Sequence, residues 1–279
     1  MEWGAGNAAD PEGSSLKARR CRADQLLVER GLAASRTEAQ ARILAGEVSS
    51  GAGRVEKAGA LLLPDAELHV TARSRFVSRG GDKLDRALAH LAAAGLDITG
   101  RVCLDVGAST GGFTDCLLQR GASRVYAVDV GYGQLAAKLR GDPRVDVRER
   151  VNARHLTVDD FSVRPDLVVV DASFIGIEKL IAAIAGVLAP GGDLVALVKP
   201  QFEAGREAAA RGRGVIRDEA TRLAAIGSAR DAIEAAGFTV VAEVDSEVHG
   251  PKGNVERFVF ARRSEAAGQE AVPPPPSAG

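Results

Sequence analysis

The sequence predicts an α/β protein, a doubly wound parallel sheet of seven strands preceded by a small α+β unit, and three observations support this. Strand-like and helix-like segments alternate from residue 101 to residue 262, which is typical of a parallel sheet. Two runs, 167–170 and 194–198, are apolar throughout, as strands buried on both faces should be. A glycine-rich segment, 107–112, lies between a predicted strand and a predicted helix, where such sheets bind their ligands.

The small unit is predicted over residues 19–72, after a stretch, 1–18, that is rich in Gly, Ala and Ser and is expected to be disordered. Leu26 and Leu27 indicate a short amphipathic helix that ends at a glycine. Ser35 and Glu38 form a capping box, in which the serine accepts a backbone N–H and the glutamate reaches back. This box predicts a second helix, and short strands follow at 47–48 and within 61–70.

A basic connector, 73–82, leads to the predicted sheet domain, 83–263, and Lys83 stands just before the first helix of that domain. The predicted strands are 101–106, 124–129, 145–149, 166–171, 192–198, 238–244 and 255–262. The predicted helices are 84–94, 112–120, 134–140, 177–188 and 218–236. The chain ends in a proline-rich tail, 264–279, that is expected to be disordered.

Composition narrows the possible functions. No run of 18 apolar residues and no basic-then-apolar leader is present, so we expect a cytoplasmic protein without a membrane span. The three cysteines and four histidines show no ligand spacing, so no metal is expected. Residues 15–90 hold 14 basic and 9 acidic side chains, although the net charge of the whole chain is −1. A positive segment of this kind favours a nucleic acid as partner.

The glycine-rich segment predicts a site for a nucleoside-containing cofactor. Asp105 ends one strand, glycines follow at 107, 111 and 112, and Asp129 ends the next strand. Glycine lets the backbone approach a ligand closely, and an acid at the end of the second strand suits the two hydroxyls of a ribose. The spacing D-x-G-x-x-x-G-G differs from the G-x-G-x-x-G of dinucleotide sites and resembles motif I of methyltransferases that use S-adenosyl-L-methionine (SAM).

Further charged residues follow the ends of predicted strands. Asp171 and Lys199 end two strands, as Asp105 and Asp129 do, so these side chains should meet at one rim of the sheet. Together with Lys83 and Glu256, Asp171 and Lys199 resemble the Lys-Asp-Lys-Glu tetrad of RNA ribose 2′-O-methyltransferases. A lysine beside a ribose hydroxyl can stabilise the developing oxyanion or take its proton, whereas an arginine cannot lose its own proton. Only seven of the 36 basic residues are lysines, and two of them occupy the tetrad positions.

Longer motifs resemble a known family. The small unit carries R-x-D-x-x-L, G-L-x-x-S-R-x-x-A and I-x-x-G-x-V, and it resembles the S4 RNA-binding domain. The larger domain carries S-R-G-G-D-K-L, D-V-G-A-S-T-G-G-F-T-D, D-A-S-F-I, L-V-K-P-Q-F-E and G-N-V-E-R-F. In this order the motifs resemble the TlyA, or hemolysin A, family over about residues 20–263.

The resemblance implies a Rossmann-like methyltransferase fold with an antiparallel last strand, and SAM-dependent 2′-O-methylation of cytidine in 16S or 23S ribosomal RNA. Ribosomal RNA or ribosomal subunits would be the partner, and the oligomeric state is left open, with a monomer favoured. The implied catalytic residues are Lys83, Asp171, Lys199 and Glu256. The implied cofactor-binding residues are Asp105, Gly107, Ala108, Ser109, Gly111, Gly112, Phe113, Asp129, Asn152 and Asp171. The implied RNA-binding residues, suited to phosphate by their forked guanidinium groups, are Arg19, Arg20, Arg22, Arg36 and Arg79.

Other functions remain as alternatives at this point. The family's older name suggests a membrane-lytic hemolysin, which the lack of a span or a basic amphipathic helix opposes. A non-catalytic RNA-binding protein would not need Lys199. An NAD(P) dehydrogenase would bind NADH rather than SAM. A pseudouridine synthase, which can also carry an S4 domain, would lack the βαβ repeat with Asp105 and Asp129.

Overall fold

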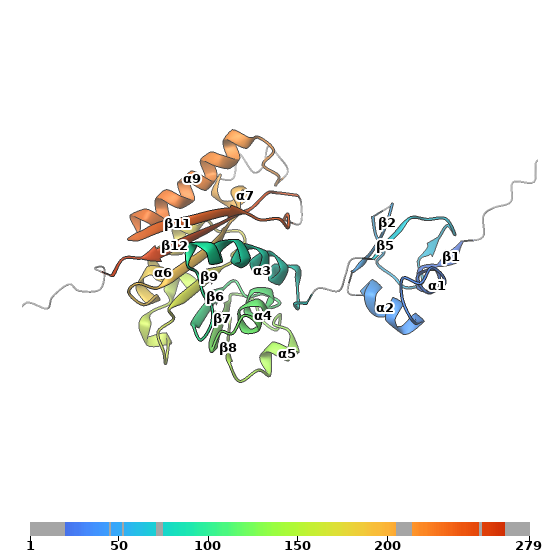
Figure 1. The fold of residues 1–279 in the computed structure, drawn as a ribbon, viewed down its shortest axis with the longest axis horizontal. Helices are drawn as coiled ribbons and strands as arrows, with labels where there is room; N and C mark the ends of the chain where they lie inside the picture. Colours follow the sequence, from blue (N-terminus) through green and yellow to red (C-terminus); the bar gives the residue numbers. More distant parts are fainter. Residues whose placement is uncertain are drawn as a thin grey trace, which may run out of the picture. The chain divides into compact units, whose positions relative to one another are not determined.

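The computed structural model describes residues 20–44, 46–51, 53–70, 75–204, 214–250 and 253–265. The chain divides into two compact units, Met1–Arg73 and Ser74–Gly279 (Figure 1). The predicted disorder of 1–18 falls outside the described residues, as does that of the tail apart from residues 264 and 265.

The smaller unit packs two helices, α1 (Ala23–Glu29) and α2 (Arg36–Leu44), against short antiparallel strands. These strands are β1 (Cys21–Arg22), β2 (Val48–Ser50), β3 (Gly53–Arg54), β4 (Leu61–Leu62) and β5 (Leu68–Val70). The predicted cap of the second helix is present, since Ser35 Oγ accepts the N–H of Glu38 at 3.2 Å. The Glu38 carboxylate reaches back to the N–H of Ala34 at 2.8 Å, one residue earlier than in the usual box.

The larger unit is built on a seven-stranded sheet with the strand order β11-β12-β10-β9-β6-β7-β8. Its strands are β6 (Val102–Val106), β7 (Arg124–Asp129), β8 (Val145–Glu149), β9 (Leu167–Val170), β10 (Asp193–Val198), β11 (Phe238–Asp245) and β12 (Arg257–Arg263). The last strand runs antiparallel to both of its neighbours, whereas the pairs from β10 to β8 are parallel. The predicted mostly parallel α/β sheet is therefore confirmed.

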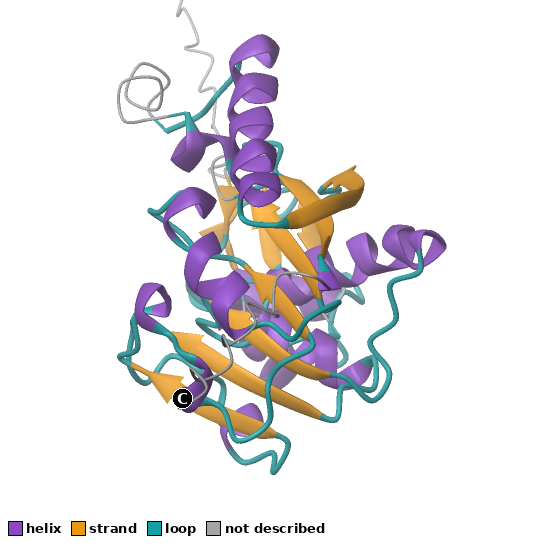
Figure 2. Cartoon of the chain, turned by 90° about the vertical axis from the view of Figure 1, so that its left-hand side faces the viewer, coloured by secondary structure: helices purple, strands orange, loops and turns teal. Residues whose placement is uncertain are grey.

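Helices cover both faces of this sheet (Figure 2). Alternate strand residues point to opposite faces. One face, with Cys103, packs against α3 (Arg79–Leu91), α4 (Gly112–Gln119) and α5 (Ala137–Arg140). The other face, with Leu104, packs against α6 (Ile181–Val187) and α9 (Glu219–Ala235). The described part of this unit also contains short helical segments: η1 (Ala92–Ala94), η2 (Ala153–His155), η3 (Val158–Asp160), η4 (Ile177–Lys179) and α7 (Pro200–Glu203).

The strand order reverses between β6 and β9, where Val106 pairs with Val170. The connection from β6 leads to one side of the sheet through β7 and β8, whereas β9 leads to the other side through β10. Ligands of doubly wound sheets bind beyond the strand ends at such a switch point. A ligand-binding site is therefore expected at the residues that follow β6 and β9.

The largest differences from the predicted element boundaries concern three helices. Helix α3 begins at Arg79, so the connector does not extend to residue 82 and Lys83 lies inside the helix rather than before it. Gly80 and Gly81 were predicted to lie in the connector, but a Cβ at Gly81 would lie 2.3 Å from Phe76 Cβ, so this glycine serves close packing within a helix. The predicted helix 177–188 is divided into η4 and α6, and the predicted helix 134–140 begins only at Ala137.

Candidate active site

The loop after β6 passes directly against the end of β9. Gly107 has a φ of 88°, and a Cβ there would lie 2.8 Å from the carbonyl oxygen of Asp171. A side chain at position 107 would therefore be both strained and blocked by backbone. The glycine lets the two strand ends approach one another and leaves a bare backbone surface above them.

Asp129, at the end of β7, holds this loop from the other side. Its carboxylate accepts the N–H of Ser109 at 2.8 Å and the N–H of Gly131 at 2.6 Å. Each carboxylate oxygen has a further acceptor position, which could take a hydroxyl donor. Asp129 and Asn152 line a cavity of about 660 Å³ that also contains Gly107 and Ser109.

This first cavity fits a nucleoside-containing cofactor. Its volume falls within the range of small-molecule sites, about 300–1,000 Å³. A carboxylate with free acceptor capacity stands at its wall, and the glycine backbone forms part of its floor. The side-chain oxygen of Asn152 accepts the N–H of Arg154 at 3.1 Å, so its amide N–H groups remain for another acceptor.

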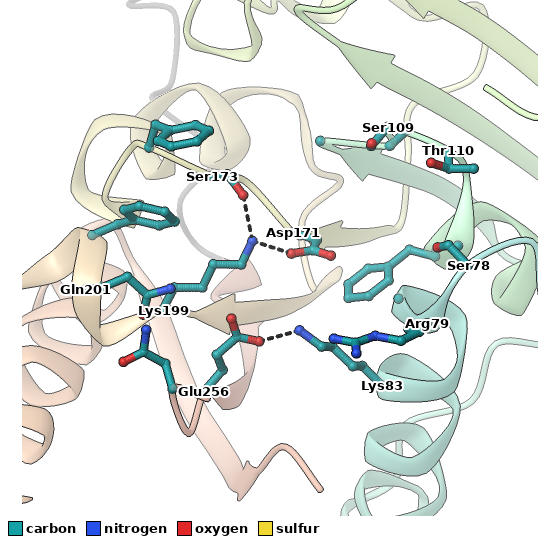
Figure 3. Close-up of a pocket in the computed structure, with 18 of the residues that line it drawn as sticks. Ser78, Arg79, Lys83, Ser109, Thr110, Asp171, Ser173, Lys199, Gln201 and Glu256 are labelled. Carbon is teal, nitrogen blue, oxygen red and sulfur yellow. Dashed lines mark hydrogen bonds and ion pairs between the residues drawn. The ribbon is translucent and has the colours of Figure 1, made fainter. Parts of the chain in front are cut away.

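A second cavity, of about 620 Å³, adjoins the first and shares Gly107, Ser109 and Asp171 with it. All four residues of the predicted tetrad line this second cavity (Figure 3). They come from separate elements: Lys83 from α3, Asp171 from the end of β9, Lys199 from the end of β10 and Glu256 from just before β12. The fold therefore brings together residues that the sequence places up to 173 positions apart.

Lys199 is held between two partners. Its ammonium Nζ lies 2.6 Å from Asp171 Oδ1, an ion pair that departs from ideal hydrogen-bond alignment, and it donates to Ser173 Oγ at 3.0 Å. The side chain is 9% exposed, so its position is set largely by these contacts and by the cavity wall. An ammonium group has three N–H donors, and two partners leave one donor for a further acceptor.

Lys83 forms the second ion pair of the cavity. Its Nζ donates to Glu256 Oε2 at 2.5 Å, and both side chains are almost fully buried, at 8% and 1% exposed. Burial of either charge alone would be costly, and the attraction between the partners offsets part of that penalty. The cavity thus contains two cations and two carboxylates in fixed pairs (Figure 3).

Asp105 lies beneath the loop rather than at a cavity wall. Its side chain has no exposed surface, and Oδ2 accepts the hydroxyl of Thr114 at 2.7 Å. Within the described part of the chain, Oδ1 has no hydrogen-bond partner. Burial, and to a smaller extent the charges of Asp171 and Asp129, raise the pKa of Asp105 to about 7, against the effect of the Thr114 hydrogen bond.

The other predicted site residues are distributed as follows. Ala108, Gly112 and Phe113 line the second cavity, as does Arg79, whose Nη2 donates to the carbonyl of His249 at 3.4 Å. Gly111, with a φ of 96°, packs against Leu139. Arg20, Arg22 and Arg36 belong to the smaller unit, and Arg19 lies outside the described residues.

Sequence reasoning assigned no role to three further residues near the second cavity. Ser173, two positions after Asp171, contacts Lys199 directly. Glu203 accepts the N–H of Ile177 at 3.0 Å, and burial raises its pKa to about 7. Asn254, 3% exposed, accepts the N–H of Ile216 at 2.9 Å and donates to the carbonyl of Gly214 at 2.8 Å. The motifs D-A-S-F, Q-F-E and G-N-V-E contain these residues, but only long-range contacts show what they touch.

A glycine loop at the switch point, an acid at the end of the second strand and an antiparallel last strand define the class of Rossmann-like methyltransferases. The chain belongs to the FtsJ-like methyltransferase family, which matches residues 76–263, and within it to the TlyA family. It is 47% identical over 247 residues to the Mycobacterium tuberculosis "16S/23S rRNA (cytidine-2'-O)-methyltransferase TlyA", covering 88% of this chain and 91% of that protein.

Two further relatives cover most of the chain. "Hemolysin A" of Brachyspira hyodysenteriae is 39% identical over 236 residues, which cover 84% of this chain and 97% of that protein. A solved structure from Streptococcus thermophilus, which carries the name of a hemolysin, is 38% identical with a TM-score of 0.69 and covers 89% of this chain and 90% of its own. Among the described residues, no helix has the length and apolar character that crossing a membrane requires.

Membership of this family makes the chain a methyltransferase and removes the dehydrogenase and pseudouridine synthase alternatives. It also implies SAM as the methyl donor. The first cavity fits that cofactor in its volume, in its glycine backbone and in the Asp129 carboxylate at its wall.

Proposed function

We propose that the chain transfers a methyl group from SAM to the ribose 2′-hydroxyl of cytidine in ribosomal RNA, 16S, 23S or both, in the cytoplasm. The observation that carries the proposal is the second cavity, where two lysines are each paired with a carboxylate beside the glycine loop. The proposed substrate is the one in the name of the Mycobacterium tuberculosis relative, which is 47% identical to this chain.

In this proposal the first cavity binds the nucleoside part of SAM. Asp129 would accept the ribose hydroxyls, Asn152 would contact the adenine end, and the backbone of 107–113 would lie along the methionine end. When bound, SAM supplies a methyl group already activated on a sulfonium. The remaining task of the protein is then mainly to align the attacking oxygen with that methyl group.

Lys199 has the central role toward the ribose oxygen. Asp171 and Ser173 fix its ammonium, so its remaining N–H can donate to the 2′-oxygen and stabilise the negative charge that develops there while the hydroxyl proton passes to solvent water. Lys83, fixed by Glu256, adds a second positive charge to the same cavity. Arg79 at the cavity wall would contact a phosphate of the RNA.

The test is incubation of the full-length protein with labelled SAM and ribosomal subunits from a strain that lacks this modification, followed by reverse transcription to map 2′-O-methyl stops. We expect label at one or a few cytidines. Lys199→Ala and Lys199→Arg should both lose transfer by at least about a hundredfold while SAM binding is kept.

Lys138→Ala is the matched control, because Lys138 is 55% exposed and pairs with Asp115 outside the cavity. It should transfer at the wild-type rate. Full methyl transfer by Lys199→Ala would reject the role of the tetrad. A wild-type protein that binds ribosomal RNA but transfers no label would favour a non-catalytic RNA-binding protein. Label on bases rather than on ribose would reject the proposed reaction.

A further inference from the structure

The smaller unit contains a buried acid, Asp24, that belongs to none of the groups discussed so far. It lies in the first turn of α1, in a segment where basic residues predominate, and its side chain is 0% exposed. An acid within a surface that binds RNA phosphate should weaken binding by repulsion. Its complete burial therefore calls for a physical reason.

Asp24 is the shared acceptor of three side chains. Arg22 donates from Nε to Oδ1 at 3.0 Å and from Nη2 to Oδ2 at 2.9 Å. Arg36 Nη2 donates to the same Oδ2 at 3.3 Å, and Gln40 Nε2 does so at 3.0 Å. The two arginines come from β1 and from the start of α2, so the carboxylate joins two elements through one oxygen.

These hydrogen bonds fix the orientation of the two arginines but occupy only some of their N–H donors. The two hydrogen bonds from Arg22 to Asp24 set the plane of the Arg22 guanidinium group. Gly59 leaves space for this group, because a Cβ at position 59 would lie 3.2 Å from Arg22 Nη1. Arg22 and Arg36 remain 42% and 54% exposed. A guanidinium has five N–H donors, so most donors of both groups are still available to a ligand.

The net charge of this cluster indicates which kind of ligand it would bind. Two guanidinium groups that share one carboxylate repel one another and carry a net charge of +1, which an anion with several acceptor oxygens would balance. Hydrogen bonds from Arg22 above all, and then from Gln40 and Arg36, hold the pKa of Asp24 well below its usual range, so the acid stays ionised at neutral pH.

We propose that Asp24 is a positioning residue that holds Arg22 and Arg36 as a fixed pair for one phosphodiester group of the RNA substrate. The inference rests on the proposed function, because it assumes an RNA substrate, but it concerns the smaller unit alone. Arginine loses little further freedom on binding when its fork is already oriented. Asp24 would thus increase RNA affinity although its own charge opposes RNA.

The direction in which RNA affinity changes when Asp24 is replaced by an uncharged side chain of the same shape tests this. Asp24→Asn keeps the shape of the side chain but places an amide N–H₂ where an arginine donor must bind. If Asp24 only repels RNA, this change tightens binding. If it positions the arginines, binding of the full-length protein to labelled, unmodified ribosomal RNA weakens by at least about tenfold, and the KM for RNA rises while kcat stays constant.

Asp65→Asn is the matched control, because it removes the same charge from an exposed turn of the same unit. It should leave affinity unchanged or raise it slightly. The slope of log affinity against log salt should also become shallower by about one phosphate contact in Asp24→Asn and not in the control.

Two further variants test the positioning role even if Asp24→Asn does not fold. Arg22→Lys keeps the charge but cannot grip both carboxylate oxygens, so it should lose RNA affinity by several-fold with an unchanged thermal melt. In the Arg22→Ala background, adding Asp24→Asn should cost less than it does alone.

The outcomes separate the two proposals. Wild-type protein that fails to bind ribosomal RNA would reject RNA as substrate. Wild-type protein that binds RNA, with Asp24→Asn or Arg22→Lys binding as tightly, would overturn the positioning role and leave the proposed reaction intact.

Discussion

Ser173 shows how a single hydroxyl can set the reactivity of the second cavity. It contacts Lys199 Nζ at 3.0 Å and has no other assigned task. Ser173→Ala should lower kcat for methyl transfer by about tenfold, because the lysine gains rotational freedom when one of its two partners is lost. The KM for SAM should not change. Steady-state kinetics with ribosomal subunits measure both values.

Ser123→Ala is a suitable comparison for that experiment. Ser123 Oγ donates to the carbonyl of Arg101 at 3.0 Å, an exposed contact at the opposite ends of the strands. Its removal should leave kcat at the wild-type value. Equal kcat values for Ser173→Ala and the wild type would show that Asp171 alone orients Lys199.

Asp105 predicts a pH dependence of stability. Its pKa is about 7 in the folded protein and about 3.9 in the unfolded chain. The folded state thus holds a proton that the unfolded state releases, so the contribution is most favourable below about pH 4 and is lost as the pH rises through 7, with an upper limit of about 4 kcal/mol. Asp105→Asn, which can still accept from Thr114, should remove this loss and raise stability at pH 8.

Urea unfolding of the full-length protein at several pH values between 5 and 8 measures this effect. Asp231→Asn, at an exposed position of α9, serves as the control and should follow the wild-type profile. If the stability of Asp105→Asn changes with pH in the same way as that of the wild type, Asp105 is ionised in the folded protein across this range.

Helices α3 and α4 approach one another more closely than side chains normally allow. A Cβ at Gly112, the first residue of α4, would lie 2.2 Å from Ser78 Oγ and 2.8 Å from the backbone N of Gly81. Gly112→Ala should therefore push the start of α3 away from the glycine loop, which costs about 1–3 kcal/mol of stability and weakens SAM binding.

Calorimetric titration with SAM and a thermal melt would show both effects. Gly227→Ala is the matched control, because Gly227 lies inside α9 and, apart from the nearby backbone of that helix, no atom lies within 4 Å of the added carbon. It should bind SAM normally and melt at the same or a higher temperature, since alanine favours a helix more than glycine does. Normal SAM binding by Gly112→Ala would show that the helices tolerate the shift.

At the scale of elements, unbroken apolar runs and the alternation of strand-like and helix-like segments were sufficient to predict the sheet. The runs at 167–170 and 194–198 are buried central strands, as expected from their unbroken apolar character. The start of α3 was not predictable in this way, because Gly80 and Gly81 have low helix propensity and only their packing against Phe76 and Gly112 explains them.

In the candidate site, too, one ion pair follows from local sequence patterns and the other depends on contacts between distant segments. Strand ends placed Asp171 and Lys199 at one rim from sequence alone, and the structure pairs them at 2.6 Å. The contact of Lys83 with Glu256 depends on the order and direction of strands that pair far along the chain, which no local pattern encodes. The roles of these residues, and the S4-like character of the smaller unit, stay predictions.

For the whole molecule, the two units imply two separable tasks. Arg22→Ala in the smaller unit should raise the KM for ribosomal RNA by about tenfold and leave both kcat and SAM affinity unchanged. Lys199→Ala should have the opposite profile, with RNA binding kept and kcat lost. A complete set of binding and kinetic constants for the two variants checks this. A change of SAM affinity in Arg22→Ala would mean that the tasks are coupled.

The pairing of Lys83 with Glu256 has a consequence for biosynthesis. The two residues are separated by 173 positions, and Glu256 immediately precedes the final strand. Lys83 and the glycine loop are translated long before Glu256, so the lysine has no carboxylate partner until the larger unit is almost complete. A premature stop codon before residue 256 would also remove β12, whose Phe258 and Phe260 are fully buried in the same core as Phe113, so the shortened polypeptide should lack a stable sheet as well as the ion pair.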